Sequence, residues 1–294
     1  MPKIIVITGP TGVGKTKLSI ALAKTLNGEI INADSMQIYK GLDIGTAKIK
    51  DNEKENIAHH LFDIKGVTED YSVYNYQQDG RMKITELLNK NKTPIIIGGT
   101  GLYIKALLYD YNFNKEKNIN TFETYSTTEL YKMLIEKEPS TNIHKNNRKR
   151  IIRRLNMINN NSFNNKSGNK LLYDVIFIGL TLPREILYDR INKRVDLMIE
   201  TGLINEVKSF YDKDIRSKAI NTGIGYKELY DYFDNKITLE EAIDLIKRNS
   251  RRYAKRQYTW FNNQMEINWF NVNLNNFNDT IEEILKYIKQ KSTQ

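Results

Sequence analysis

The chain of 294 residues carries a phosphate-binding pattern near its start, G-x-x-x-x-G-K-S/T, because residues 9–16 read Gly-Pro-Thr-Gly-Val-Gly-Lys-Thr. The pattern stands in the context it requires, since an apolar β-branched run at 4–7 precedes it and a helical periodicity follows from Lys17. Glycines let the backbone wrap around a phosphate, so that amide groups and the helix N-terminus point at the anion. Lys15 supplies a mobile positive charge, and the Thr16 hydroxyl supplies a ligand for magnesium. The segment predicts a site for a di- or polyphosphate and leaves open which compound carries it.

A second candidate is an acid at the end of an early strand. Most P-loop nucleotidases carry a carboxylate at the end of a later apolar strand, where it holds the magnesium shell. Here the apolar runs 95–97 and 175–180 end in Gly-Gly-Thr and Thr-Leu-Pro, without an acid. Asp34 instead follows the short run 30–31, at the edge of a parallel sheet where ligands bind. Judged by its own position, Asp34 fits a helix cap as well as it fits a catalytic role. Because it lies opposite a P-loop that has no other acid, Asp34 is predicted to be catalytic.

The charge of the chain indicates a polyanionic partner. Lysine and arginine number 45 against 35 acidic residues, a net charge of +10. The segments 145–154 and 247–256 each hold six basic residues and no acid. Solvated helix faces normally mix signs, so these segments predict contacts to phosphates; the alternative is a basic surface with a structural role only. The second segment also contains Tyr253, and Tyr258 follows it, which suits stacking against nucleic-acid bases.

Composition excludes several classes of function. The chain has no cysteine, which removes disulfides, Cys-ligated zinc, iron–sulfur clusters and thiolate nucleophiles. His59, His60 and His144 lack a zinc-enzyme spacing and are assigned to structure or loops. Apolar runs are far shorter than a membrane span, and the N-terminus enters a strand without a secretory signal. We expect a cytoplasmic protein that does not associate with membranes and has no obligate protein partner.

The elements that must position these residues alternate between strand and helix. The pattern predicts strands at 3–8, 30–31 and 94–97, helices at 17–26, 73–88 and 102–108, and a polar loop at 49–70. Such alternation is typical of an α/β fold, here a P-loop-type doubly wound parallel sheet.

The alternation stops in the middle of the chain, which predicts a helical insertion. Helical patterns occur there at 128–136 and 148–158, followed by an Asn-rich loop at 159–169. The core pattern then resumes with a strand at 175–180, a helix at 184–200, a long basic helix opened by a capping box at 238–241, and a last strand within 266–272. We therefore divide the chain into a first part of the P-loop α/β core (1–110), a mostly helical and basic insertion (111–172), and the continued core with its basic C-terminal helix (173–294).

The segment 34–48, Asp-Ser-Met-Gln-Ile-Tyr-Lys-Gly-Leu-Asp-Ile-Gly-Thr-Ala-Lys, together with the P-loop before it, resembles the tRNA dimethylallyltransferases. The resemblance continues in order through 98–103, 143–150, 223–228 and 253–261, so that it covers nearly the whole chain. The chain departs from the family pattern at four positions of the insertion, namely Lys145, Asn147, Arg154 and Asn156.

The resemblance implies transfer of a dimethylallyl group from dimethylallyl diphosphate to N6 of adenosine 37 in the tRNA anticodon loop, with release of diphosphate and dependence on Mg²⁺. The adenine amine is a poor nucleophile because its lone pair is delocalised into the ring. Asp34 is therefore expected to accept the N6 proton, while Lys15, magnesium on Thr16 and a further cation, Arg194 or Arg190, ease the departure of diphosphate.

The resemblance implies binding roles for residues 11–16 at the prenyl diphosphate and for residues 34–37 with Thr100 and the insertion at tRNA, and the motif and charge patterns add the others. Those expected at the prenyl diphosphate are Gly9, Pro10, Thr11, Gly12, Val13, Gly14, Lys15, Thr16 and Arg190. Those expected at the anticodon stem-loop of tRNA are Asp34, Ser35, Met36, Gln37, Thr100, Lys149, Arg150, Arg153, Arg252, Lys255, Arg256 and Gln257.

Two other functions remain open at this point. A small-molecule P-loop kinase would turn over ATP, but the missing second strand-end acid argues against it. An RNA-binding P-loop protein that uses nucleotide as a switch would keep the basic segments and would not require Asp34.

Overall fold

The computed structural model describes residues 3–113, 122, 124–159 and 169–292. It divides the chain into two units, a core formed by Met1–Leu108 with Leu171–Gln294 and an insertion formed by Tyr109–Lys170. The sequence had indicated an insertion at 111–172. Within the core, the Leu172 amide donates to the Leu108 carbonyl at 2.9 Å, so the chain leaves and re-enters the core at adjacent points.

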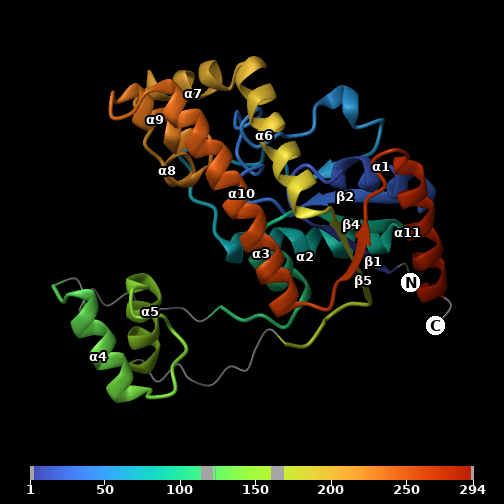
Figure 1. Ribbon diagram of the computed structural model, residues 1–294. Coiled ribbons are helices and arrows are strands. Elements are labelled where there is room, and N and C mark those ends of the chain that lie inside the picture. The colour runs from blue at the N-terminus through green and yellow to red at the C-terminus, as the bar shows by residue number, and fades with distance from the viewer. Residues whose placement is uncertain (1–2, 114–121, 123, 160–168, 293–294) are drawn as a thin grey trace. The chain divides into compact units, whose positions relative to one another are not determined.

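The core is built on a parallel sheet, which confirms the predicted fold class (Figure 1). Its strands are β1 (Ile4–Thr8), β2 (Gly28–Asn32), β3 (His59–His60), β4 (Thr93–Ile97), β5 (Val175–Thr181) and β6 (Asn268–Asn271), in the order β3-β2-β4-β1-β5-β6. Val6 of the central strand pairs in register with Ile96 on one side and Phe177 on the other. All of β1 is buried, which explains why its sequence is a continuous β-branched run rather than an alternating one.

Both faces of the sheet are covered by helices. The helices α1 (Lys15–Thr25) and α11 (Phe277–Ser292) lie together on one face (Figure 1). The helices α2 (Val73–Asn89) and α3 (Gly101–Leu108) pack on each other at the opposite face. This arrangement places the N-terminus of α1 at the carboxyl edge of the sheet, where the P-loop must lie to present its amides.

Two long helices carry the second half of the core. The helix α6 (Arg184–Glu200) packs against α10 (Leu239–Gln264). The predicted capping box of α10 is present, since the Thr238 hydroxyl accepts from the Glu241 amide at 3.2 Å and the Glu241 carboxylate accepts from the Thr238 amide at 2.8 Å. At one end of this pair lie α7 (Leu203–Tyr211), α8 (Lys218–Thr222) and α9 (Tyr226–Phe233) (Figure 1).

The prediction of a loop throughout 49–70 was wrong. This stretch contains a short 3₁₀ helix, η1 (Asp51–Glu53), and the edge strand β3. Two histidines give no apolar alternation, so β3 has no signal of its own; it exists because His59 and His60 pair with Ile30 and Ile31 of β2.

The insertion unit is a pair of helices, α4 (Thr127–Lys137) and α5 (Arg148–Asn159), around a small apolar core. Its buried residues are Phe122, Leu130, Leu134, Ile151 and Leu155. The predicted Asn-rich loop lies mostly outside the described residues. In the part of the chain that the structure describes, no helix has both the length and the apolar character needed to cross a bilayer.

Candidate active site

The P-loop lies between β1 and α1 and carries three glycines with positive φ, among them Gly9 at 135° and Gly14 at 97°. These backbone conformations are open to glycine and strained for other residues. A Cβ on Gly9 would lie 2.5 Å from the Leu180 carbonyl oxygen of β5, and one on Gly14 would lie 2.6 Å from the Phe277 ring of α11. The loop is therefore packed tightly between neighbouring elements, which fixes the positions of its amides.

Lys15 is held under this loop. Its Nζ donates to the Gly9 carbonyl at 2.9 Å and to the Pro10 carbonyl at 2.8 Å. Burial lowers the pKa of Lys15 to about 7, with the Arg194 guanidinium contributing to the decrease, whereas Asp34 acts in the opposite direction. An ammonium so perturbed is stabilised by any anion that enters the site.

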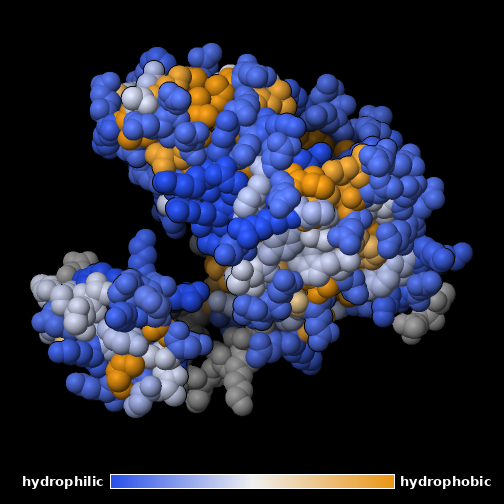
Figure 2. Space-filling view, in the orientation of Figure 1, coloured by the Kyte–Doolittle hydropathy of each residue, from blue (hydrophilic) through white to orange (hydrophobic). Residues whose placement is uncertain are grey.

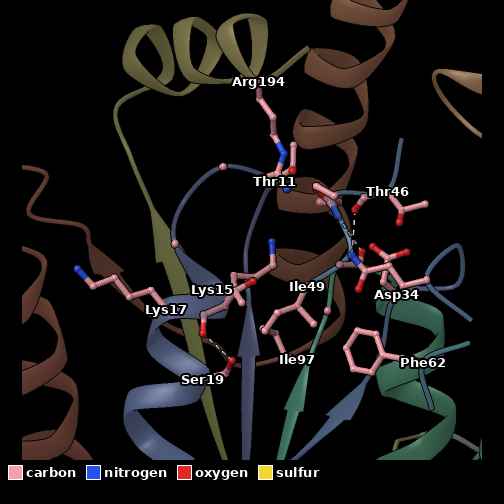
Figure 3. Close-up of a pocket in the computed structure, with 18 of the residues that line it drawn as sticks. Thr11, Lys15, Lys17, Ser19, Asp34, Thr46, Ile49, Phe62, Ile97 and Arg194 are labelled. Carbon is pink, nitrogen blue, oxygen red and sulfur yellow. Dashed lines mark hydrogen bonds between the residues drawn. The ribbon is translucent and has the colours of Figure 1, made fainter. Parts of the chain in front are cut away.

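The P-loop opens into a cavity of about 360 Å³ (Figure 3). Figure 3 shows Lys15 and Asp34 on opposite sides of this cavity, with apolar side chains between them. The lining residues come from the P-loop and α1, the ends of β2 and β4, the segments 46–49 and 59–62, and the helices α6 and α10: Thr11, Gly12, Gly14, Lys15, Thr16, Lys17, Ser19, Asp34, Gln37, Thr46, Ala47, Ile49, His59, Phe62, Ile97, Gly98, Gly99, Arg190, Arg194, Tyr253 and Gln257.

Asp34 is fixed by its neighbours in the turn after β2. The buried side chain of Asn32 accepts from the Asp34 amide at 2.8 Å and donates to the Asp34 carbonyl at 3.0 Å. The Asp34 carboxylate accepts from the Met36 amide at 2.9 Å. Burial raises the pKa of Asp34, and the Met36 amide and the Lys15 ammonium oppose this rise. Asp34 thus caps a turn, not a helix, and is also a carboxylate with increased basicity at the cavity.

Both arginines expected at the diphosphate line the cavity from α6. Arg190 donates from Nε to the Gly12 carbonyl of the P-loop at 2.9 Å. Burial lowers the pKa of Arg194, and the neighbouring Arg190 adds to this effect. The sequence alone leaves open which arginine meets the diphosphate, and the geometry admits both.

The other core residues predicted to meet tRNA lie beside Asp34. The Thr100 hydroxyl accepts from the Ser35 amide at 3.0 Å. Gln37 donates to the Thr46 carbonyl at 2.9 Å and lines the cavity. Met36 does not line it and lies against Gly223 instead, where a Cβ would be 2.8 Å from its terminal methyl.

Gln257 is buried against the turn after β4. Its Nε2 donates to the Gly99 carbonyl at 3.0 Å, while its buried Oε1 has no hydrogen-bond partner among the described residues. One helical turn earlier on α10, Tyr253 also lines the cavity. Burial, with Asp34 nearby, raises the pKa of Tyr253 to about 12, so its hydroxyl keeps its proton at neutral pH.

The basic segment 247–256 has two faces. Lys247 pairs with Asp196 of α6 at 2.5 Å, so this part of the segment holds α10 to α6. Arg252, Lys255 and Arg256 are exposed, and Figure 2 shows a strongly hydrophilic surface over the middle of α10. The segment therefore combines the structural role and the exposed cations that the sequence had offered as alternatives.

The basic segment of the insertion is divided in a similar way. Lys149, Arg150 and Arg153 on α5 are exposed. Arg154 donates from Nε and Nη2 to Glu138 at 2.6 and 2.8 Å, which ties α5 to the end of α4. The segment lacks acids along the sequence, but the fold supplies one from a residue 16 positions earlier.

Several lining residues were not predicted from the sequence. His59 had been assigned to structure or loops, yet it lines the cavity from β3. Burial lowers the pKa of His59, which favours a neutral ring. Ile49, Phe62 and Ile97 form an apolar wall, and nothing in their local pattern distinguishes them from core residues. Thr46 and Ala47 lie in the segment 34–48 that carries the family resemblance, which was an available signal.

Among the described residues, no group of three His, Asp or Glu side chains could hold a metal ion. At the cavity, the donors suited to Mg²⁺ are the Thr16 hydroxyl and the Asp34 carboxylate. This sparse set fits a magnesium ion that takes the rest of its oxygen ligands from substrate phosphates and water.

Comparison with known proteins identifies relatives across the whole chain. The family model described as IPP transferase matches residues 37–264. The tRNA dimethylallyltransferase of Anoxybacillus flavithermus is 50% identical over 301 residues, covering 98% of this chain and 97% of that protein. The tRNA dimethylallyltransferase of Bacillus subtilis is 48% identical over 284 residues, covering 92% and 90%.

Solved structures give the same result. The full-length tRNA isopentenylpyrophosphate transferase of Bacillus halodurans has a TM-score of 0.78 at 44% identity and covers 99% of this chain and 97% of that one. A eukaryotic dimethylallyltransferase acting on tRNA has a TM-score of 0.79 at 30% identity, covering 92% and 74%. The chain therefore belongs to the IPP transferase family of tRNA dimethylallyltransferases.

Proposed function

We propose that this enzyme transfers a dimethylallyl group from dimethylallyl diphosphate to N6 of adenosine 37 in the anticodon loop of tRNA, releasing diphosphate. The observation that carries the proposal is the continuous cavity that joins the P-loop and Lys15 to the apolar wall and to Asp34 (Figure 3). A prenyl diphosphate needs an anion site and an apolar site next to each other, and the attacking amine needs a base beyond them.

The diphosphate is expected on the P-loop amides, with Lys15, Arg190 and Arg194 around it. All three side chains line the cavity before any ligand enters, so little reorganisation is needed when charge develops on the leaving group. A magnesium ion would be held by Thr16 and the phosphate oxygens and would supply further charge neutralisation. The five-carbon group would then lie along Ile49, Phe62 and Ile97.

The base is expected to be Asp34. In the reaction, a bond forms between N6 of the adenine and C1 of the prenyl group as the C1–O bond breaks and the diphosphate leaves with the electron pair. The N6 proton passes to the Asp34 carboxylate, whose raised pKa increases its affinity for that proton. To reach this position, the adenosine must leave the anticodon loop and enter the cavity.

The remaining parts of the tRNA are expected on the basic segments. Lys149, Arg150 and Arg153 of α5 and the exposed cations of α10 would bind phosphates of the anticodon stem-loop, which gives affinity without base specificity. Base edges would be read beside Asp34, by the side chains that lie around it: Ser35, Gln37, Thr100 and Gln257. Because the substrate is tRNA, we infer that the enzyme works in the cytoplasm.

A small-molecule kinase is less well supported. Among the described residues that line the cavity, Asp34 is the one carboxylate, whereas a kinase needs acids both for its magnesium ions and for its base.

The test is a transfer reaction with purified enzyme, magnesium, dimethylallyl diphosphate and an anticodon stem-loop RNA, followed by nucleoside mass spectrometry. We expect the N6-isopentenyl mass at adenosine 37 and none in a matched RNA with guanosine at that position. In cells, deletion of the gene should remove the same mass and its thiomethylated derivative from tRNA. Turnover of ATP without any prenylated nucleoside would refute the proposal and favour the kinase.

A further inference from the structure

A carboxylate outside the cavity holds one of its walls. Glu206, on α7, accepts hydrogen bonds from three consecutive backbone amides of a loop far away in the sequence. The distances are 3.1 Å from Asp43, 2.7 Å from Ile44 and 3.1 Å from Gly45. Bonds from amides to an ionised carboxylate are about twice as strong as neutral ones.

A tyrosine completes this arrangement. The Tyr226 hydroxyl of α9 donates to Glu206 Oε1 at 2.6 Å. Burial raises the pKa of Tyr226 and the adjacent Glu206 carboxylate raises it further, so the phenol remains a donor. The ring of Tyr226 also packs on Gly45, where a Cβ would lie 2.6 Å from it. With four donors, the Glu206 carboxylate has used the capacity of its two oxygens.

The loop that Glu206 binds leads directly into the active site. Thr46, Ala47 and Ile49 line the cavity immediately after Gly45. The Thr46 carbonyl accepts from the Gln37 side chain at 2.9 Å, which links this wall to the turn that carries Asp34. Displacement of residues 43–45 would therefore move both the wall and Gln37.

The other side of the loop is anchored separately. The buried ammonium of Lys48 donates to the Tyr39 carbonyl at 2.8 Å and pairs with Asp43 at 2.6 Å and with Asp63 at 2.5 Å. Asp63 follows Phe62 of the apolar wall. Lys48 thus ties the loop to the segment that follows β3, and Glu206 ties it to the helices α7 and α9.

We propose that Glu206 is a positioning residue for prenyl transfer, which holds residues 43–49 so that the cavity wall and Gln37 stay aligned with Asp34. Glu206 does not line the cavity and acts through the loop. The inference rests on the proposed function, but the hydrogen-bonding geometry itself is independent of it.

The test compares Glu206→Gln with a matched variant, Glu241→Gln. The glutamine keeps the size of Glu206 but cannot accept all four donors, because its amide nitrogen is itself a donor. Glu241 accepts from the Thr238 amide at 2.8 Å in the capping box of α10 and does not line the cavity, so its variant also loses a bond to a carboxylate.

We expect Glu206→Gln to lower kcat about 10- to 100-fold, as for a sub-ångström misplacement of reacting groups. Its affinity for inorganic diphosphate, measured by calorimetry without RNA, should stay within about threefold, because the P-loop does not depend on residues 43–45. Hydrogen exchange at the amides of Asp43, Ile44 and Gly45 should accelerate at least about tenfold, while exchange in β1 stays unchanged.

Glu241→Gln should keep kcat and the exchange of residues 43–45. Adding Tyr226→Phe to Glu206→Gln should lower kcat no further, because the phenol acts through that carboxylate.

Wild-type kcat in Glu206→Gln would overturn the inference, as would a decrease of kcat without faster exchange at 43–45. A similar decrease of kcat in Glu241→Gln would mean that the loss of kcat comes from general destabilisation of the fold, and this result would also overturn the inference. If the wild-type enzyme itself fails to prenylate tRNA, the proposed function fails, and the exchange comparison still shows whether Glu206 holds the loop.

Discussion

Binding of a diphosphate should draw a proton from solution, because of the environment of Lys15. In the ligand-free protein the pKa of Lys15 is lowered to about 7 by burial and by Arg194. At pH 8 a group with this pKa is about nine-tenths neutral. An anion beside the ammonium favours the charged form, and a rise of the pKa by about two units leaves it about nine-tenths protonated at pH 8. Uptake by Lys15 should therefore be about 0.8 proton per site at pH 8 and about 0.1 at pH 6, where Lys15 already carries its proton.

The assay is calorimetric titration with dimethylallyl diphosphate at pH 8 in two buffers of different ionisation enthalpy. At this pH the phosphates have lost their last proton, whose pKa is about 6, so the ligand releases none. Lys15→Met should abolish the uptake, whereas Lys24→Met, on the same helix outside the cavity, should keep it. Asp34→Asn should also keep it, which excludes the carboxyl as the proton acceptor. Uptake below about 0.2 in the wild type, or equal uptake in Lys15→Met, would refute the reasoning.

The site supports three more testable expectations. Asp34→Asn should reduce kcat by about 10²–10⁴, the usual range for a general base, with prenyl diphosphate affinity nearly unchanged; single-turnover kinetics at saturating substrate check this, and near wild-type turnover would contradict it. The triple alanine variant of Lys149, Arg150 and Arg153 should reduce the slope of log K for tRNA against log salt by about 0.7–0.9 for each phosphate that is no longer bound, measured by filter binding at several salt concentrations; an unaltered slope would assign these residues to a solvated face. Phe62→Ala should enlarge the apolar part of the cavity by the volume of a ring. It should raise kcat/KM for geranyl diphosphate relative to dimethylallyl diphosphate by about tenfold, the size of effect that one or two methylenes have on selectivity. An unchanged ratio of kcat/KM in competition assays would show that the prenyl group lies elsewhere.

The fold class could be predicted because its signals are local. The β-branched run of β1, the P-loop and the capping box at Thr238 each lie within a few residues, and each has one structural interpretation. The helix α11 could also have been predicted, since Ile284 and Ile288 are spaced for one buried face, but no element was assigned beyond residue 272. The short helix α8 and the strand β3 carry too few residues for a periodic signal.

The cavity could be predicted only at its two polar ends. The P-loop motif and Asp34 are recognisable because few other roles fit their residue types and positions. Ile49 follows β2, whereas His59 lies on β3 and Phe62 comes just after it, and these side chains meet at residues that are distant in sequence. For the same reason, the sequence does not reveal that the amides of residues 43–45 donate to Glu206, more than 160 positions away, or that Arg154 pairs with Glu138.

The adjacency of Leu108 and Leu172 has a consequence for how this enzyme can evolve. A segment that leaves and returns at neighbouring points can be exchanged, shortened or lost without a change in strand order, since residues 108 and 172 are already in hydrogen-bonding contact. Such an exchange would leave unchanged the order of the strands that position Lys15 and Asp34. The exposed basic residues Lys149, Arg150 and Arg153 all lie in that segment. The part of the chain proposed to bind RNA phosphates could therefore be changed without rebuilding the site around Lys15 and Asp34.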